Sequence, residues 1–201
     1  MNSKEISTNW DKHANKWDSF LLKIFFNIIY RNSIKLIKEH LRGKILDIGC
    51  ATGNFLSKIQ KINKNLDLYG IDSSKKMIDI AKRKFENIKF YNLRAEDIDF
   101  PSNYFDVITI IETFHHIQDQ NIVLEKISKI LKQDGILLIS EPNIDNKIIN
   151  LLVKFFKNFS IEKETKFLTK EEIIKLASNF QLKNIKTTKF LGNIFLLFKK
   201  T

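Results

Sequence analysis

With 201 residues and a mass of 23.7 kDa, the chain has the length of one ordinary domain. Its 43% hydrophobic and 28% charged residues are near the averages of globular proteins, which excludes a disordered or collagen-like chain. The net charge of +11 is concentrated at the two ends, because residues 1–44 carry +5, residues 45–150 carry −1 and residues 151–201 carry +7. Basic ends either attract nucleic acid, anionic lipid or an acidic metabolite, or form an ordinary solvated surface.

The sequence carries no sign of secretion or of a membrane anchor. Charged residues interrupt the apolar runs among the first 20 residues, unlike in a signal peptide. The longest apolar stretches, 21–30 and 148–156, are shorter than the roughly 20 residues that a membrane span requires. The single cysteine, Cys50, excludes an internal disulfide and a zinc site made of several cysteines. We therefore expect a soluble protein of the cytoplasm.

Short β-branched runs alternate with amphipathic stretches through the middle of the chain. Strands are predicted at 44–48, 66–71, 88–91, 105–111 and 136–140, helices at 54–60, 74–85 and 122–131, and a turn at 133–135. Ser73 or Ser74 can cap the second of these helices. Strand–helix alternation of this kind indicates a parallel sheet with right-handed crossovers.

The two ends of the chain have a different pattern. Residues 20–41 predict one or two helices, and residues 148–159 predict another. Thr169 opens a further helix, because Glu172 follows it at the spacing of a capping box. Residues 182–190 and 193–199 predict two closing strands around Gly192. This hairpin would put an antiparallel strand at the end of an otherwise parallel sheet.

The segment 45–55 carries the most information about function. An apolar strand runs into a glycine-containing turn that opens a helix, as in nucleotide sites at the carboxyl end of a sheet. The dinucleotide fingerprint needs glycine at the first, third and sixth positions, but Ala51 and Asn54 are third and sixth from Gly49. The phosphate-binding Walker loop needs Gly-Lys-Ser/Thr, whereas Asn54 follows Gly53. Both phosphate-binding motifs are therefore excluded.

Two acidic residues indicate what the turn binds instead. Asp47, just before the turn, would repel a pyrophosphate but suits a ligand with a positive charge. Asp72 ends the second strand, 23 residues beyond Gly49, where an acid accepts hydrogen bonds from both ribose hydroxyls. These features together predict a cationic cofactor with a ribose and no phosphate. S-adenosylmethionine has these properties.

Several motifs in order resemble those of class I S-adenosylmethionine-dependent methyltransferases. The motifs are Leu46–Gly53, with Ala51 in place of the middle glycine, 69–77, 94–101, 105–117 and 131–139. Each motif is weak alone, but the resemblance covers about residues 10–142. It is closest to the small-molecule methyltransferases of the ubiquinone/menaquinone-biosynthesis type.

The resemblance implies a Rossmann-like, doubly wound α/β fold: a mostly parallel seven-stranded sheet with an antiparallel last strand and extra N-terminal helices. The chain would be a single domain with an N-terminal helical lid (1–43), a cofactor-binding core (44–141), and substrate-side helices with the closing hairpin (142–201). The implied cofactor-binding residues are Trp17, Asp47, Gly49, Cys50, Ala51, Gly53, Asp72, Ser73, Met77, Ala95, Glu96, Asp97, Ile111 and Glu112.

The resemblance also implies roles for some of these residues. Asp72 would bind the ribose and Met77 would line the adenine pocket, next to residues 95–97. Trp17 would close the lid over the cofactor, where the family usually has Tyr. Cys50 would contribute mainly its backbone, since no base partner for a thiolate is evident.

The adjacent histidines His115 and His116 follow the fourth strand. They point in different directions, so they cannot share one purpose. One reading is a structural cap; the other is a general base, for which His116 is the candidate catalytic residue. A zinc site needs three or four ligands, and because His13 and His40 lie far away in sequence we expect no metal.

These observations predict an enzyme that methylates a small, lipophilic acceptor, which residues 112–116 would face. Phenylalanines of the two basic amphipathic stretches, such as Phe26, either pack in the core or roof the acceptor pocket. One alternative is an RNA or other nucleic-acid methyltransferase, but residues 111–114 lack the Asn/Asp-Pro-Pro-Tyr/Phe motif of base methylation. Another alternative is a non-catalytic cofactor-binding protein. Peripheral membrane contact and the oligomeric state stay open.

Overall fold

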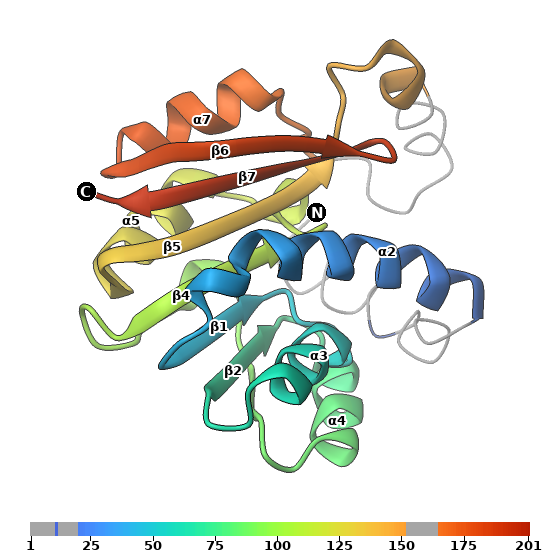
Figure 1. The fold of residues 1–201 in the computed structure, drawn as a ribbon, viewed down its shortest axis with the longest axis vertical. Coiled ribbons are helices and arrows are strands. Elements are labelled where there is room, and N and C mark those ends of the chain that lie inside the picture. The colour runs from blue at the N-terminus through green and yellow to red at the C-terminus, as the bar shows by residue number, and fades with distance from the viewer. Residues whose placement is uncertain (1–10, 12–19, 152–164) are drawn as a thin grey trace.

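The computed structural model describes residue 11 and residues 20–151 and 165–201. Its strands form one seven-stranded sheet in the order β3-β2-β1-β4-β5-β7-β6 (Figure 1). The strands are β1 (Lys44–Ile48), β2 (Asp67–Asp72), β3 (Lys89–Asn92), β4 (Phe105–Ile111), β5 (Leu131–Pro142), β6 (Leu182–Phe190) and β7 (Asn193–Lys200). Strands β1 to β5 are parallel to one another, and β7 is antiparallel to both β5 and β6. The predicted fold class is confirmed.

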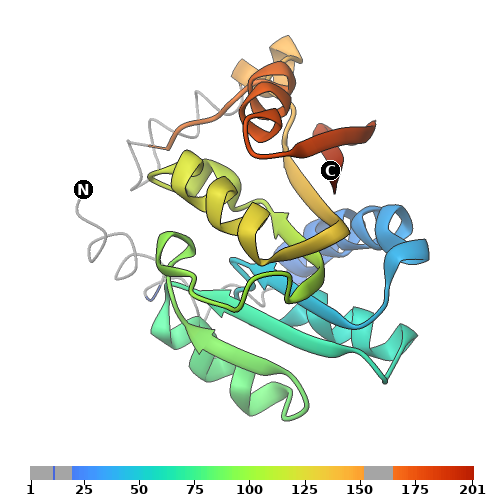
Figure 2. The same ribbon diagram turned by 90° about the vertical axis from the view of Figure 1, so that its left-hand side faces the viewer.

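Helices cover both faces of the sheet, as a doubly wound fold requires (Figure 2). The helices are α2 (Phe20–Ile37), α3 (Asn54–Ile62), α4 (Lys75–Lys84), α5 (Gln120–Ile130) and α7 (Lys170–Ser178), with short 3-10 turns η1 (Lys38–His40), η2 (Ala95–Asp97) and η3 (Phe114–His116). One apolar core lies under α2, α3 and α4, and contains Ile37, Ile59 and Ile78. The other lies under α5 and α7, and contains Ile127 and Ile173.

The predicted caps explain where two helices begin. Ser74, not Ser73, caps α4, since its side-chain oxygen accepts the backbone N–H of Met77 at 3.2 Å. Thr169 and Glu172 form the predicted capping box at the start of α7. None of the described helices is long and apolar enough to cross a bilayer.

The predicted turn at 133–135 is wrong, because these residues lie inside β5. Phe105 pairs with Leu131 and Val107 pairs with Ile136, so one residue of β4 faces four residues of β5. The extra residues form a bulge in which Asp134 has a φ of +60°. Gly and Asp therefore mark an irregularity within the strand instead of its beginning.

The remaining predicted elements lie close to their observed bounds. The stretch 20–41 forms α2 followed by η1, which is within the predicted one or two helices. The predicted helix 148–159 begins within the described residues, at 147–151, and its remainder lies outside them. The predicted lid residue Trp17 also lies outside the described residues.

Candidate active site

A pocket opens at the carboxyl ends of β1, β2 and β4, and encloses about 900 Å³ including its mouth. Because β1 lies between β2 and β4, the chain reverses its direction of winding here, and doubly wound sheets bind ligands at such a point. The turn after β1, the end of β2, and the turns η2 and η3 form most of the wall. Helix α2 closes one side with Phe26 and Tyr30.

The turn after β1 is held in a left-handed backbone conformation. Gly49, Ala51 and Gly53 have φ values of +75°, +46° and +78°. The N–H groups of Gly49 and Cys50 both donate to the carbonyl of Ile71 on β2, at 2.8 and 3.0 Å. A Cβ at Gly49 would lie 2.3 Å from the side chain of Thr113. The turn is therefore pressed against β2 and the end of β4, and only glycine fits at its first position.

Asp72 joins this turn to the start of α4. Its Oδ2 accepts the N–H of Ala51 at 2.9 Å, and its Oδ1 accepts the N–H of Ser74 at 2.8 Å. Burial raises the pKa of Asp72 to about 6, although these two hydrogen bonds act in the opposite direction. The carboxylate is thus fixed in the pocket wall and dominates above about pH 6.

Other predicted cofactor residues lie under or beside the pocket wall. Asp47 is 3% exposed, and its Oδ1 accepts the hydroxyl of Thr109 at 2.6 Å. Burial raises the pKa of Asp47 to about 7. Cys50 is buried, and burial raises the pKa of its thiol, which keeps the thiol protonated. Gly53 precedes α3 and packs beside Phe90.

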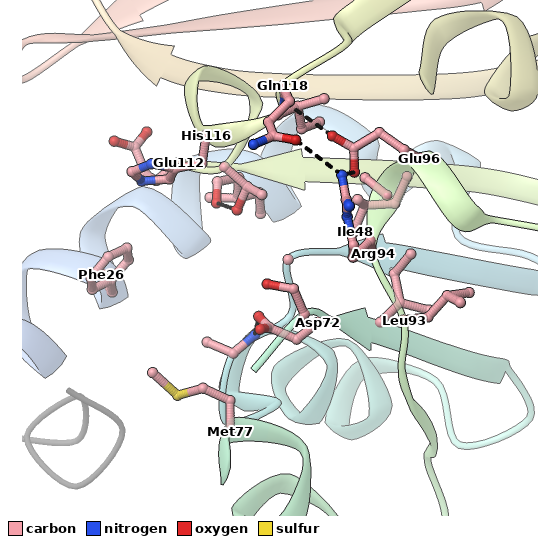
Figure 3. A pocket seen from close by; sticks show the side chains of 18 of the residues that line it. Phe26, Ile48, Asp72, Met77, Leu93, Arg94, Glu96, Glu112, His116 and Gln118 are labelled. Atoms are coloured by element: carbon pink, nitrogen blue, oxygen red, sulfur yellow. Dashed lines mark hydrogen bonds and ion pairs between the residues drawn. The ribbon is translucent and has the colours of Figure 1, made fainter. Parts of the chain in front are cut away.

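The turn η2 supplies the opposite wall. Ala95 and Glu96 line the pocket, whereas Asp97 is exposed outside it. The guanidinium of Arg94 lies 3.2 Å from Glu96 Oε2 and donates to Gln118 Oε1 at 3.3 Å (Figure 3). The N–H of Gln118 donates to Glu96 Oε1 at 3.0 Å, so η2 is tied to the loop after η3.

Residues that the sequence analysis did not single out also line the pocket. Arg94 is the first residue of the motif 94–101 and Thr113 lies within the motif 105–117, so both were marked by the sequence. Gln118 and Tyr30 had no such signal, because only the folded chain brings them to the wall. Phe26, a candidate roof residue, does line the pocket.

The two adjacent histidines have different surroundings. His115 is 8% exposed, its Nδ1 contacts Glu141 Oε2, and its ring stacks on Phe167 with centroids 4.3 Å apart. His116 lines the pocket on the same side as Phe26 and Glu112 (Figure 3). Only His116 is therefore placed to meet a ligand.

The described residue of the N-terminal segment, Asp11, contacts the site from outside. Its Oδ1 accepts the hydroxyl of Ser74 at 2.6 Å and the N–H of Lys76 at 3.0 Å. The carboxylate therefore lies at the start of α4, where it also raises the pKa of Asp72. No local sequence pattern indicates this contact across more than 60 residues.

Comparisons with known proteins agree with this geometry. A family model described as a methyltransferase domain matches residues 39–190. The chain belongs to the family of S-adenosylmethionine-dependent methyltransferases. It is 27% identical over 180 residues to an uncharacterised protein of Methanocaldococcus jannaschii, covering 89% of this chain and 83% of that protein.

The chain is also similar to a named methyltransferase in sequence and to a solved methyltransferase in fold. It is 33% identical over 103 residues to the ubiquinone/menaquinone biosynthesis C-methyltransferase UbiE of Campylobacter jejuni, a match that spans 49% of this chain and only 44% of that relative. An S-adenosylmethionine-dependent methyltransferase of Thermotoga maritima has the same fold, with a TM-score of 0.80, 16% identity, and coverage of 98% of this chain and 100% of the other. S-adenosylmethionine is thus the cofactor that the family indicates.

The pKa of Asp72 predicts how cofactor affinity of this methyltransferase depends on pH. Only the ionised carboxylate accepts hydrogen bonds with both oxygens, and a pKa of about 6 means that acid removes this form. Affinity for S-adenosylhomocysteine should fall about tenfold from pH 7 to pH 5, as the ionised fraction does. Calorimetric titration measures it. Asp72→Asn should bind weakly at both pH values, and an equal fall in that variant would assign the pH effect to another group.

The left-handed Ala51 predicts a stabilising substitution in the methyltransferase. A non-glycine residue in this conformation costs about 1–2 kcal/mol. Glycine at this position would remove the cost, but part of the gain would be lost because glycine raises the entropy of the unfolded chain. Ala51→Gly should therefore raise the free energy of unfolding by about 0.5–1 kcal/mol in urea titrations. Ala81→Gly, in the buried face of α4, should lower it. A loss of stability in both variants would contradict the interpretation.

Proposed function

We propose that the protein transfers the methyl group of S-adenosylmethionine to a small, apolar acceptor. The observation that supports it best is one pocket with two unlike ends. Asp72, fixed between the left-handed turn and α4, suits an adenosine. The other end combines the aromatic rings of Phe26 and Tyr30 with Glu112 and His116. An adenosine at one end leaves the aromatic end for the acceptor.

In this proposal the cofactor lies along the turn after β1. Asp72 binds the ribose hydroxyls, and Met77 and Ala95 contact the adenine. Glu96 accepts a hydrogen bond from the amino group of the adenine. The backbone of residues 49–53 follows the methionine part. Asp47, in β1 just before the turn, accepts the hydroxyl of Thr109 on β4 and does not touch the ligand in this arrangement. Residues 1–43, with Trp17, would serve as the lid, next to the contact that Asp11 makes with α4.

The chemistry requires mainly correct placement. The sulfonium methyl is electrophilic, and in-line displacement moves it to the acceptor atom while the bonding electron pair stays on sulfur. Holding the two reacting atoms at about 3–3.5 Å can lower the barrier by about 7–11 kcal/mol. The positive charge on sulfur disappears during transfer, so a pocket with little water favours the reaction.

A lipophilic ring compound is the acceptor class that we favour. The relative from Campylobacter jejuni is named for ubiquinone/menaquinone biosynthesis, and the wall at the acceptor end includes two aromatic rings. The proposal places the protein in the cytoplasm, where a buried, unpaired Cys50 stays reduced. Methylation of RNA is the alternative, supported by the basic ends of the chain; salt-sensitive gel shifts would favour it.

Calorimetric titration with S-adenosylhomocysteine tests the cofactor part of the proposal. Wild-type protein should bind, and Asp72→Ala should lose at least tenfold in affinity, because the ribose loses its acceptor. Asp79→Ala, an exposed acid on α4, is the matched control and should bind like wild type. If wild-type protein does not bind, the proposed function fails.

Acceptor screening with phenols, quinols, amines and RNA tests the second part. Wild-type protein should methylate at least one small apolar compound, and His116→Gln should reduce the rate about 100-fold or more if His116 acts as a general base. An unchanged rate in that variant would remove His116 from the chemistry. Cofactor binding without any methyl transfer would favour a non-catalytic cofactor-binding protein.

A further inference from the structure

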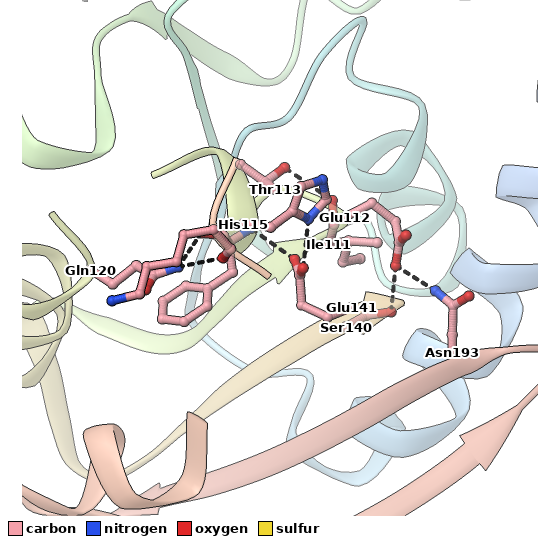
Figure 4. Close-up of polar contacts among 10 residues, drawn as sticks. Ile111, Glu112, Thr113, His115, Gln120, Ser140, Glu141 and Asn193 are labelled. Atoms are coloured by element: carbon pink, nitrogen blue, oxygen red, sulfur yellow. Dashed lines mark hydrogen bonds and ion pairs between the residues drawn. The ribbon is translucent and has the colours of Figure 1, made fainter. Parts of the chain in front are cut away.

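Glu112 holds an unusual position at the acceptor end of the pocket. It directly follows β4, has a φ of +53°, and lines the pocket wall. Its Oε1 accepts the hydroxyl of Ser140 at 3.3 Å and the side-chain amide of Asn193 (Figure 4). Both partners are buried, Ser140 at 0% and Asn193 at 5% exposure, and they belong to β5 and β7. Two strands outside the proposed adenosine site therefore fix this carboxyl group.

The second oxygen of the same carboxyl is available to a ligand. Within the described part of the chain, both side-chain hydrogen bonds of Glu112 use Oε1. The residue is partly exposed and lines the pocket. Oε2 is thus the carboxyl oxygen left without a side-chain hydrogen bond among the described residues.

A second carboxylate lies behind the first. Glu141 is 3% exposed, its Oε1 accepts the N–H of Phe114 at 2.8 Å, and its Oε2 contacts His115 Nδ1. Both of its oxygens are therefore engaged within the protein. Burial, and next the negative charge of Glu141, raise the pKa of Glu112 well above its ordinary value.

Other groups around Glu112 carry little compensating charge. The residues that adjoin it or share its end of the pocket are Glu141 from β5, His115 and His116 from η3, Asn193 from β7, and Phe26 and Tyr30 from α2. The opposite wall contains the carboxyls of Asp72 and Glu96 and the guanidinium of Arg94, which is paired with Glu96. A carboxylate in such surroundings gains from a nearby cation and from a proton. The sulfonium cofactor would supply the cation, and an acidic acceptor would supply the proton.

We propose that Glu112 binds the acceptor and removes its proton, through Oε2 and an O–H or N–H group of that acceptor. This inference rests on the proposed function. The new bond forms between the acceptor atom and the methyl carbon while the carbon–sulfur bond breaks and its electron pair stays on sulfur. The acceptor proton moves to Oε2. A sulfonium and a carboxylate thus become a neutral sulfide and a carboxylic acid.

Glu112 was predicted both among the cofactor-binding residues and in the stretch 112–116 that faces the acceptor, and in this proposal its side chain serves the acceptor. A base whose proton affinity is raised removes protons from weak acids more effectively. The hydrogen bonds from Ser140 and Asn193 make these two side chains positioning residues for it. The inferred acceptor class is therefore a phenol, an enol, a hydroxyl or a protonated amine.

Glu112→Gln tests the proposal, because it keeps the size of the side chain and an oxygen for Asn193. Affinity for S-adenosylhomocysteine should stay within about threefold of wild type. Methyl transfer to an O–H or N–H acceptor from the screen should fall about 100-fold or more, as for loss of a general base. In the wild type, the rate should fall toward acid pH as Glu112 becomes protonated, and this fall should be absent in Glu112→Gln. Glu125→Gln, an exposed acid of α5, should change neither quantity.

The outcomes separate this inference from the proposed function. Transfer within threefold of wild type, with the same pH profile, would overturn the role of Glu112 while wild-type turnover upholds the function. Loss of S-adenosylhomocysteine binding in Glu112→Gln would assign the residue to the cofactor instead. Failure of wild-type protein to bind that compound would overturn both.

Infrared difference spectra provide a second readout that needs no acceptor. Wild type minus Glu112→Gln should show a carboxyl signal that ionises at a higher pH than an ordinary glutamic acid in the free protein. Adding S-adenosylmethionine should move this ionisation to lower pH, because the sulfonium favours the ionised form, whereas S-adenosylhomocysteine, with its neutral sulfur, should leave it unchanged. A signal that responds equally to both compounds would place Glu112 away from the reacting atoms and refute the proposal.

Discussion

The hydrogen bonds that Asp72 accepts from Ala51 and Ser74 hold the site together. They join the turn after β1 to the first residue before α4, two segments that would otherwise be separate loops at the end of the sheet. Each bond uses a backbone N–H that a helix or turn leaves without a partner. One carboxylate therefore shapes the wall of the pocket and remains directed toward it.

The sheet explains why this carboxylate and Glu112 lie within one pocket. Strand β1 pairs with β2 on one side and with β4 on the other, so Asp72 and Glu112 extend from strands two positions apart. The left-handed turn after β1 lies between them, pressed against Thr113. The parallel strands thus bring together groups that are 40 residues apart in the chain.

Local sequence patterns were sufficient to predict those helices and strands whose formation depends on residues close together in the chain. The buried run 105–111 and the start of α4 at Ser74 follow from hydrophobic periodicity and capping, and both were predicted. The beginning of β5 was missed because Asp134 and Gly135 have the composition of a turn, while pairing with β4 decides their conformation.

The site itself was predictable only in part. The turn and Asp72 have a fixed spacing that sequence shows directly. The hydrogen bond between Asn193 and Glu112 joins residues 81 positions apart, and nothing near Asn193 indicates it. Likewise, which of two adjacent histidines enters the pocket depends on Glu141, whose carboxyl holds His115 in the interior. Long-range contacts of this kind exist only once the sheet has formed.

Asn193, at the first position of β7, has a consequence for how such proteins diversify. The residues proposed for adenosine precede Gln118, whereas this amide comes from the antiparallel end of the sheet, near the carboxyl terminus. In the proposed arrangement, one residue that positions Glu112 is thus encoded far from every residue proposed for adenosine. A change at Asn193 would alter the surroundings of Glu112 and leave the residues proposed for adenosine unchanged.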